Sequence, residues 1–344
     1  MKSKNYFLNK INNPLIIKDF YLPEPRPGEV MVKIFFSGIC RSQIMEISGY
    51  RNNKKFLPHF LGHEGSGIVV KVGEGVKKVK KNDEVILTWI KGRGMDVNNG
   101  KVVNKNIIAN YGPITTLGQY SLISENRLVK KPKSMNRKIA ALFGCALCTG
   151  FGIVINELKL KKNKNINVAV YGLGGVGYSS LVMLKSLGIK NITVLDNNYK
   201  KLEVAKRIGV KNIVNTSNTN FSKNNKDYFK NKFDLCIETC GNSSTIESAF
   251  NIIKDNGKVI FASHPKKFDK ISIDPFELIK GKKIAGTWGG NTRPDKDVKI
   301  FFNIIKKNLK YLKPMTRNVY SLSQVNKAIK DLRSGNVLRP LIKM

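Results

Sequence analysis

Three residues of this chain are of types that could hold a metal ion together. Cys40 and His63 lie 23 positions apart, and Cys145 follows later in the chain. Two thiolates and one imidazole suit tetrahedral Zn²⁺, whose fourth position is then open to water or substrate. An ion held in this way acts as a Lewis acid and acidifies a bound hydroxyl. The three residues therefore indicate metal-assisted chemistry at an oxygen atom.

The cysteines also have a plainer interpretation. A free cysteine is more often a small buried hydrophobic residue than a ligand, and spacing alone does not separate the two roles. Cys148, Cys236 and Cys240 are assigned to the buried class. An odd number of cysteines, five in a long chain with no secretion signal, indicates free thiols or metal ligands rather than a disulfide framework.

A glycine-rich turn predicts a nucleotide site in the second half of the chain. An apolar run at 168–171 leads into the turn, and a helical pattern follows directly. The spacing G-x-G-x-x-G gives a tight turn, close approach of the backbone to a pyrophosphate, and close packing of helix on strand. The turn consists of Gly172, Gly174, Gly175, Val176 and Gly177.

The next apolar run ends in an acidic residue that favours NAD. Asp196 lies 19 positions after Gly177, near the separation expected for the acid that binds the adenosine ribose. A carboxylate at that place repels a 2′-phosphate, so NAD is expected rather than NADP. The alternative is that Asp196 is only a turn residue before the next helix.

The elements that must position these residues fall into three stretches. Short β-rich runs separated by Gly and Pro occupy about 29–129 and predict a compact, mostly β domain. From about 147 to 285 strands and helices alternate, which predicts a parallel, doubly wound sheet. The tail 297–344 reads as two helices and a short strand. The expected strands are 30–36, 67–72, 84–88, 119–123, 167–171, 191–195, 235–238 and 258–262, and the expected helices are 177–187, 200–208, 298–307 and 324–333.

Composition excludes several classes of protein and leaves one alternative. The chain has 344 residues, of which 41% are hydrophobic, so it can bury a large core, and no apolar stretch approaches the ~20 residues that span a bilayer. A cytoplasmic protein with no membrane partner is expected. The formal charge of +37 allows a nucleic-acid-binding protein. We expect no nucleic-acid partner, because the lysines are dispersed among asparagines and no nucleic-acid-binding motif occurs.

Taken together, these residues resemble the zinc-dependent alcohol dehydrogenase branch of the medium-chain dehydrogenase/reductase superfamily, over nearly the full length. The run Gly62-His63-Glu64-x-x-Gly67-x5-Gly73-x-x-Val76 fits the zinc signature of that family, and the other motifs follow in family order. The resemblance implies an α/β protein with an N-terminal GroES-like, β-rich catalytic domain, at 1–146 and 288–344. A Rossmann NAD-binding domain is expected at 147–287.

The resemblance also implies roles for the residues around the metal. Cys40, His63 and Cys145 would bind one catalytic zinc, the two-cysteine, one-histidine set of alcohol dehydrogenases. Glu64 would lie behind the metal or bind it transiently. Ser42 would pass a proton from the substrate hydroxyl toward solvent.

Further residues would bind the dinucleotide by the same resemblance. Arg41 and Arg339 would hold the pyrophosphate, Asp196 and Lys201 the adenosine ribose, and Thr149 would lie near the nicotinamide. For Arg41, Lys201 and Arg339 the alternative is a solvated surface charge.

Three departures from the family pattern affect these expectations. Gln43 stands where the family commonly has an Asp that orients the zinc histidine, and we expect Gln43 to accept that hydrogen bond without a charge. Met45 replaces a histidine that often ends the proton relay. The stretch 89–116 has no cysteine, so the structural zinc of the family is not expected.

The predicted function is therefore the reversible oxidation of an alcohol, secondary or sugar-like alcohols included, to a carbonyl with NAD. The partner is a small alcohol or carbonyl substrate, and a homo-oligomer, dimer or tetramer, is expected from the family. The alternatives are a zinc-independent quinone or enone reductase of the same superfamily, or a non-catalytic basic nucleic-acid-binding protein.

Overall fold

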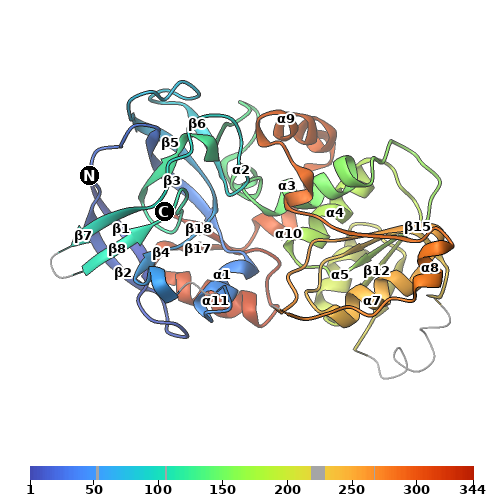
Figure 1. The fold of residues 1–344 in the computed structure, drawn as a ribbon. Coiled ribbons are helices and arrows are strands. Elements are labelled where there is room, and N and C mark those ends of the chain that lie inside the picture. Colours follow the sequence, from blue (N-terminus) through green and yellow to red (C-terminus); the bar gives the residue numbers. More distant parts are fainter. Residues whose placement is uncertain (52–53, 105–106, 218–228, 267) are drawn as a thin grey trace. The chain divides into compact units, whose positions relative to one another are not determined.

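The computed structural model describes residues 1–51, 54–104, 107–217, 229–266 and 268–344 (Figure 1). The chain forms two compact units. Unit 1 contains 1–145, 293–302 and 315–344, and unit 2 contains 146–292 and 303–314. These limits differ from the expected domains mainly at 303–314, which packs with unit 2, where the Tyr178 hydroxyl donates to the Tyr311 carbonyl over 2.8 Å.

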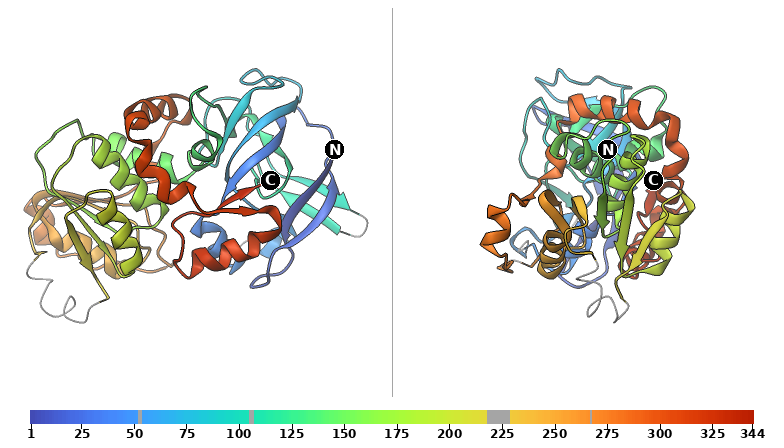
Figure 2. Two further views of the ribbon diagram at one scale, coloured as in Figure 1. Left: turned by 180° about the vertical axis from the view of Figure 1, so that it is seen from behind. Right: turned by 90° about the vertical axis from the view of Figure 1, so that its right-hand side faces the viewer.

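One sheet of unit 1 is built around a long strand, β3 (Glu29–Gly38). Its order is β10-β6-β5-β3-β18-β17, with β9 also paired to β3. Along one edge of β3, β9 pairs with 29–33 and the C-terminal β18 pairs with 36–38, so the red end of the chain lies beside a blue strand (Figure 2). The other strands are β5 (Glu64–Val72), β6 (Glu84–Thr88), β9 (Tyr120–Ser124), β10 (Leu128–Lys130), β17 (Val319–Ser321) and β18 (Leu341–Lys343).

The second sheet of unit 1 has the order β2-β1-β4-β8-β7. Inward-facing residues such as Phe7, Phe20 and Val102 are buried and pack in one apolar cluster. The charged residues of β1, Lys2 and Lys4, are exposed. The strands are β1 (Lys2–Leu8), β2 (Ile16–Tyr21), β4 (His59–Phe60), β7 (Gly100–Asn104) and β8 (Ile107–Tyr111).

Short helices connect the strands of unit 1 near the ends of β3 and β5. The side chain of Asn136 caps α2 by accepting from the Ile139 N–H at 2.9 Å, as its residue type favours. Strongly amphipathic α11 packs beside α1 and buries Val325, Ala328 and Ile329. The helices are α1 (Arg41–Ile47), α2 (Arg137–Leu142) and α11 (Val325–Arg333), with 3₁₀ turns at 54–56, 125–127 and 322–324.

Unit 2 confirms the doubly wound parallel sheet. Its strand order is β13-β12-β11-β14-β15-β16, and every pair is parallel, so the chain winds outward in both directions from β11. Strands β11 and β12 are buried along their whole length, which explains their continuous apolar sequence. The strands are β11 (Val168–Tyr171), β12 (Ile192–Asp196), β13 (Asn212–Asn215), β14 (Phe233–Glu238), β15 (Ile253–Phe261) and β16 (Lys283–Gly286).

The helices of unit 2 follow the strands in alternation. Among the described residues of this unit, the helices are α3 (Ala146–Gly152), α4 (Gly175–Ser186), α5 (Tyr199–Arg207), α7 (Ser243–Ile252) and α8 (Pro275–Ile279), with a π-helical turn at 153–157 and a 3₁₀ turn at 289–291. The chain passes between the units through α9 (Pro294–Ile305), a 3₁₀ segment at 306–312 and α10 (Lys313–Thr316). Among the described residues, no helix is both long and apolar enough to cross a membrane.

Candidate functional site

Unit 1 brings together the three predicted metal ligands. Cys40 is the N-cap of α1, His63 directly precedes β5, and Cys145 follows α2. Their potential ligand atoms all lie within 4.8 Å of one another, and the two sulfurs are 4.0 Å apart. That distance is too long for a disulfide and close to the ~3.8 Å edge of a tetrahedron with metal–sulfur bonds of about 2.3 Å. The three donors therefore fit a zinc ion.

The two thiols are electrostatically different. A hydrogen bond from Cys145, together with the positive charge of Arg339 and contact with His63, holds the pKa of Cys40 well below its ordinary value against the opposing effect of burial. The same hydrogen bond, with burial, raises the pKa of Cys145 well above the ordinary value. These shifts favour the thiolate form of Cys40 and the protonated form of Cys145, and an ion bound by both sulfurs would release the Cys145 proton.

Glu64 and Arg339 form a buried ion pair whose charges act on the two thiols. Glu64 begins β5 and is fully buried, and Arg339 is only 3% exposed. Arg339 Nη2 donates to Glu64 Oε2 over 3.1 Å, and Nε lies 2.8 Å from Oε1 without the alignment of a hydrogen bond. Burial raises the pKa of Glu64, which Arg339 only partly offsets. The expected contact of Arg339 with a pyrophosphate stays a prediction, but its guanidinium is no solvated surface charge.

Helix α1 places two further residues on His63. Ser42 Oγ lies 3.4 Å from His63 Nε2, which suits its expected role in proton transfer. Gln43 is fully buried, and its Nε2 lies 2.9 Å from His63 Nδ1. Its Oε1 accepts the Cys40 backbone N–H over 2.6 Å. The expectation that Gln43 accepts from His63 is therefore wrong, because the amide nitrogen and not the oxygen faces the ring, while the oxygen is directed to the Cys40 N–H.

One turn beyond Ser42, a second histidine contacts α1. The buried His59 Nε2 lies 2.9 Å from Glu46 Oε1, and His59 Nδ1 has no hydrogen-bond partner among the described residues. Sequence analysis gave neither residue a role, since the two belong to no motif. Arg41, the first residue of α1, is exposed.

In unit 2 the glycine turn has the geometry that a pyrophosphate requires. Gly172 has a φ of +90°, and a Cβ at Gly177 would lie 1.9 Å from the Gly172 carbonyl oxygen, so no larger residue fits there. A Cβ at Gly174 would meet no atom within 4 Å, which leaves space for a ligand beside the backbone. Helix α4 begins at Gly175, with its N-terminus at the turn.

Asp196, at the end of β12, is tied to this turn. Its Oδ2 accepts the Leu173 N–H over 2.7 Å, its Oδ1 accepts the Asn198 N–H over 2.8 Å, and Lys201 Nζ lies 3.5 Å from Oδ2. Asp196 and Lys201 are thus paired at the place where the resemblance puts the ribose. On α3, the buried Thr149 hydroxyl has no hydrogen-bond partner among the described residues.

Carboxylates hold the cysteine-free stretch where no structural zinc was expected. Glu125 accepts the backbone N–H groups of Lys77, Lys78 and Met95 at 2.7–2.8 Å. Asp295 accepts the Arg93 N–H over 2.6 Å. In the part of the chain that the structure describes, the Cys40, His63 and Cys145 cluster is the one group of three or more potential ligands.

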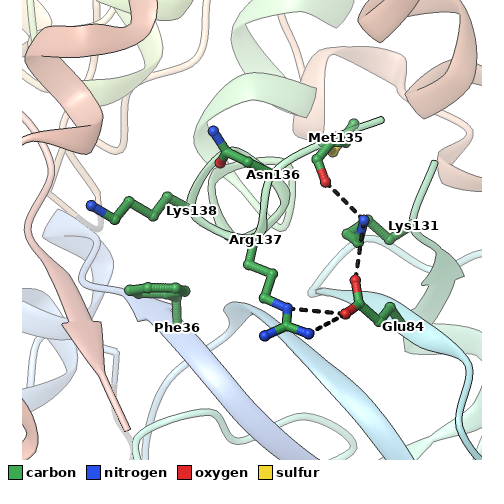
Figure 3. A pocket seen from close by; sticks show the side chains of 7 residues that line it. All are labelled: Phe36, Glu84, Lys131, Met135, Asn136, Arg137 and Lys138. Carbon is green, nitrogen blue, oxygen red and sulfur yellow. Dashed lines mark hydrogen bonds and ion pairs between the residues drawn. The ribbon is translucent and has the colours of Figure 1, made fainter. Parts of the chain in front are cut away.

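A separate cavity of about 520 Å³ lies in unit 1 beside β6 and α2 (Figure 3). Its cations are largely paired within the protein. Both Arg137 and Lys131 contact Glu84, and Lys131 also donates to the Met135 carbonyl over 2.7 Å. None of the predicted site residues lines it.

Comparison with known proteins agrees with this fold. Residues 26–133 match the alcohol dehydrogenase GroES-like domain, and residues 175–307 match the zinc-binding dehydrogenase family. An S-(hydroxymethyl)glutathione dehydrogenase of Escherichia coli is 27% identical over the full length of both chains. A class-3 alcohol dehydrogenase of Drosophila melanogaster is 28% identical over 96% of this chain and 94% of the relative.

A solved structure shows the same fold. The benzyl alcohol dehydrogenase of Acinetobacter calcoaceticus superposes with a TM-score of 0.89 at 22% identity, over 100% of this chain and 99% of that one. The two family matches follow the expected order, and the relatives align from end to end. The fold is the same, and unit 1 contains the cluster of two cysteines and one histidine. The chain belongs to the zinc-dependent alcohol dehydrogenases of the medium-chain dehydrogenase/reductase superfamily, oxidoreductases that act on CH–OH groups.

Proposed function

We propose that this enzyme oxidises an alcohol reversibly with a single zinc ion at Cys40, His63 and Cys145 and with NAD at the Gly172–Gly177 turn. The observation that supports it most strongly is the geometry of the three donors, with the sulfurs 4.0 Å apart and all donor atoms within 4.8 Å. Bound there, zinc supplies the Lewis acidity that acidifies an alcohol hydroxyl, and the nicotinamide supplies the hydride acceptor.

The protein's own residues handle the proton and the charge. Ser42 Oγ, 3.4 Å from a ring nitrogen of His63, is placed to accept the hydroxyl proton and pass it on. The positive charge of Arg339 stabilises the thiolate state of Cys40 in the metal-free protein. Glu64 in turn fixes Arg339, because both side chains are buried and make their ion pair with each other. Glu64 thus acts at the metal site through Arg339.

The preference for NAD rests on Asp196. Its carboxylate is held at the end of β12 by two backbone N–H groups, so it cannot turn away to admit a 2′-phosphate. We expect Asp196→Ala to lower kcat/KM with NAD by about tenfold to a hundredfold and to narrow the preference over NADP, since an ionised hydrogen bond contributes about 1.5–3 kcal/mol. Parallel steady-state assays with the two cofactors measure this preference.

The substrate class is a small alcohol or its carbonyl. The relatives are named for S-(hydroxymethyl)glutathione and benzyl alcohol, which differ in size and charge, so neither name fixes the substrate. A panel of primary, secondary and sugar-like alcohols and their carbonyls, followed by NADH absorbance with zinc measured on the same sample, tests the proposal. Turnover without zinc would favour a zinc-independent reductase and contradict it.

We also propose a cytoplasmic homo-oligomer that associates through unit 2. Strand β16 is an edge of the parallel sheet, and the neighbouring Phe276, Ile279 and Trp288 are 58%, 79% and 72% exposed. An unpaired edge flanked by exposed apolar side chains favours association with a second copy. Light scattering after size-exclusion chromatography should give a dimer or tetramer, and a monomer at micromolar concentration would contradict it.

A further inference from the structure

Gln43 lies between two groups that set the direction of its amide. The side chain is fully buried at the third position of α1, next to the Cys40 backbone nitrogen and the His63 ring. A backbone N–H can only donate a hydrogen bond. The atom of Gln43 that lies 2.6 Å from the Cys40 nitrogen must therefore be the amide oxygen. The amide nitrogen then faces His63 Nδ1 at 2.9 Å.

This direction selects one tautomer of His63. An amide –NH₂ has no acceptor capacity, so Nδ1 must accept the hydrogen bond through its lone pair. A neutral imidazole carries one N–H, which is consequently on Nε2. Ser42 Oγ, 3.4 Å from Nε2, is placed on that side of the ring.

A metal ion requires the other tautomer. With Nδ1 covered by Gln43, Nε2 is the ring nitrogen left for a metal, and ligation uses its lone pair. The proton then moves to Nδ1 and faces the –NH₂ group, so that two donors oppose each other. Turning the amide over does not solve this conflict, because the –NH₂ group would then face the Cys40 N–H.

We propose that Gln43 is a positioning residue that weakens zinc binding, because its amide can satisfy Cys40 or the metal-binding tautomer of His63 but not both. Zinc binding must therefore break either the buried hydrogen bond between Gln43 and Cys40 or the one between Gln43 and His63. A carboxylate of the same length has two acceptor oxygens and can satisfy both donors at once. The inference rests on the proposed function only in requiring that zinc bind at Cys40, His63 and Cys145.

The direct test compares zinc affinities by competition with a chromogenic chelator. Gln43→Glu replaces –NH₂ by oxygen with no change in length, and it should bind zinc about tenfold to a hundredfold more tightly than the wild type, the range found when a partner of a metal-bound histidine is altered. Met45→Glu adds the same charge to the same helix without replacing the contact to His63, and its affinity should change by less than about threefold. Equal affinities of Gln43→Glu and wild type, or equal gains in the two variants, would overturn the inference.

A second measurement gives its deciding result on the wild type alone. The chain has three histidines, so long-range ¹H–¹⁵N spectra of the metal-free protein can be assigned. We expect His63 to carry its proton on Nε2 in the wild type and on Nδ1 in Gln43→Glu. A wild-type His63 protonated on Nδ1 would overturn the inference while leaving the zinc site intact. If Cys40→Ala bound zinc as tightly as the wild type, the proposed zinc site itself would be wrong.

Discussion

Two regions of unit 1 bury carboxylates in opposite ways. In the metal cluster a buried carboxylate is paired with a buried side-chain cation, and burial raises the pKa of Glu64. The metal cluster is defined as Cys40, His63, Cys145, Glu64 and Arg339. The second region is centred on Glu125, which is 2% exposed and accepts the backbone N–H of Met95, in the stretch 91–96, and those of Lys77 and Lys78. Burial would raise the pKa of Glu125 too, but the hydrogen bonds from Met95, Lys78 and Lys77 outweigh it and the pKa is lowered.

The difference is that the hydrogen-bonding groups around Glu125 are satisfied by the protein itself, whereas the metal cluster has donor atoms that an ion would satisfy. Backbone N–H groups satisfy both oxygens of Glu125, and Lys91 pairs with Asp96 in the stretch 91–96, so groups of the protein itself satisfy the charges there. The metal cluster has two sulfurs sharing one hydrogen bond and a histidine held in the wrong tautomer for ligation. Substitutions around Glu125 should therefore affect only the stability of the fold. Substitutions in the metal cluster should affect metal binding as well.

The largest effect is expected at Cys40. Cys40→Ala removes a ligand, so bound zinc should fall to background and kcat/KM by about 10³-fold or more, since a Lewis acid contributes several kcal/mol. Elemental analysis and NADH assays on one sample measure both. Cys236→Ala, which removes a buried thiol of unit 2, is the matched control and should keep its zinc. Full activity of metal-free Cys40→Ala would contradict the mechanism.

The next largest effect is expected at Arg339. Arg339→Met leaves Glu64 buried without its cation, and losing one partner of such a pair costs about 3–5 kcal/mol of unfolding free energy. Urea unfolding measures the loss. The double variant Glu64→Gln/Arg339→Met should recover part of it, because the uncompensated charge is gone. A double variant as unstable as Arg339→Met would show that the packing of Arg339, and not its charge, is what matters.

The sequence predicted best those parts in which local pattern decides structure. Strand β6 has the expected limits, 84–88, and the strands and helices around the glycine turn were expected within a few residues, because buried parallel strands read as apolar runs. Strands β1, β2, β7 and β8 were missed. In β1 the buried residues Ser3 and Asn5 are polar, β2 is mostly exposed, and β7 and β8 bury only one or two of their five residues, so none of the four shows a clear apolar alternation.

At the site, the sequence predicted residue types but not their mutual contacts. Cys40, His63 and Cys145 were chosen from type and spacing, and the structure brings them together. The Glu64–Arg339 pair joins residues 275 positions apart, and it forms because β18 pairs with β3, which no local pattern encodes. The direction of the Gln43 amide depends on a backbone N–H, which is the same for every residue type at position 40.

A smaller loss of stability is expected at Glu125. Glu125→Ala leaves three partly buried N–H groups without their acceptor and should cost about 2–3 kcal/mol of unfolding free energy, less than the full cost of desolvating three such groups because water can reach them. Zinc content should not change, which separates the two regions. Hydrogen exchange at Met95 should speed up in the variant and stay unchanged when the wild type is treated with a chelator. Loss of zinc in Glu125→Ala would contradict the statement that the Glu125 region and the metal cluster act independently.

The smallest effect is the pH dependence of the Glu125 contribution. Because the pKa of Glu125 is lower in the folded state than its ordinary value of 4.5, the unfolded chain takes up the proton first as the pH falls. The stabilisation is therefore fully present above the ordinary value and is lost as the pH falls through the folded value. Glu125→Gln cannot ionise, and its –NH₂ group must face one of the backbone N–H groups that the two carboxylate oxygens accept in the wild type, so it should be about 1–2 kcal/mol less stable than wild type at neutral pH. Urea unfolding across the acid range should show this difference shrinking toward low pH, and a constant difference would mean that the carboxylate charge contributes nothing.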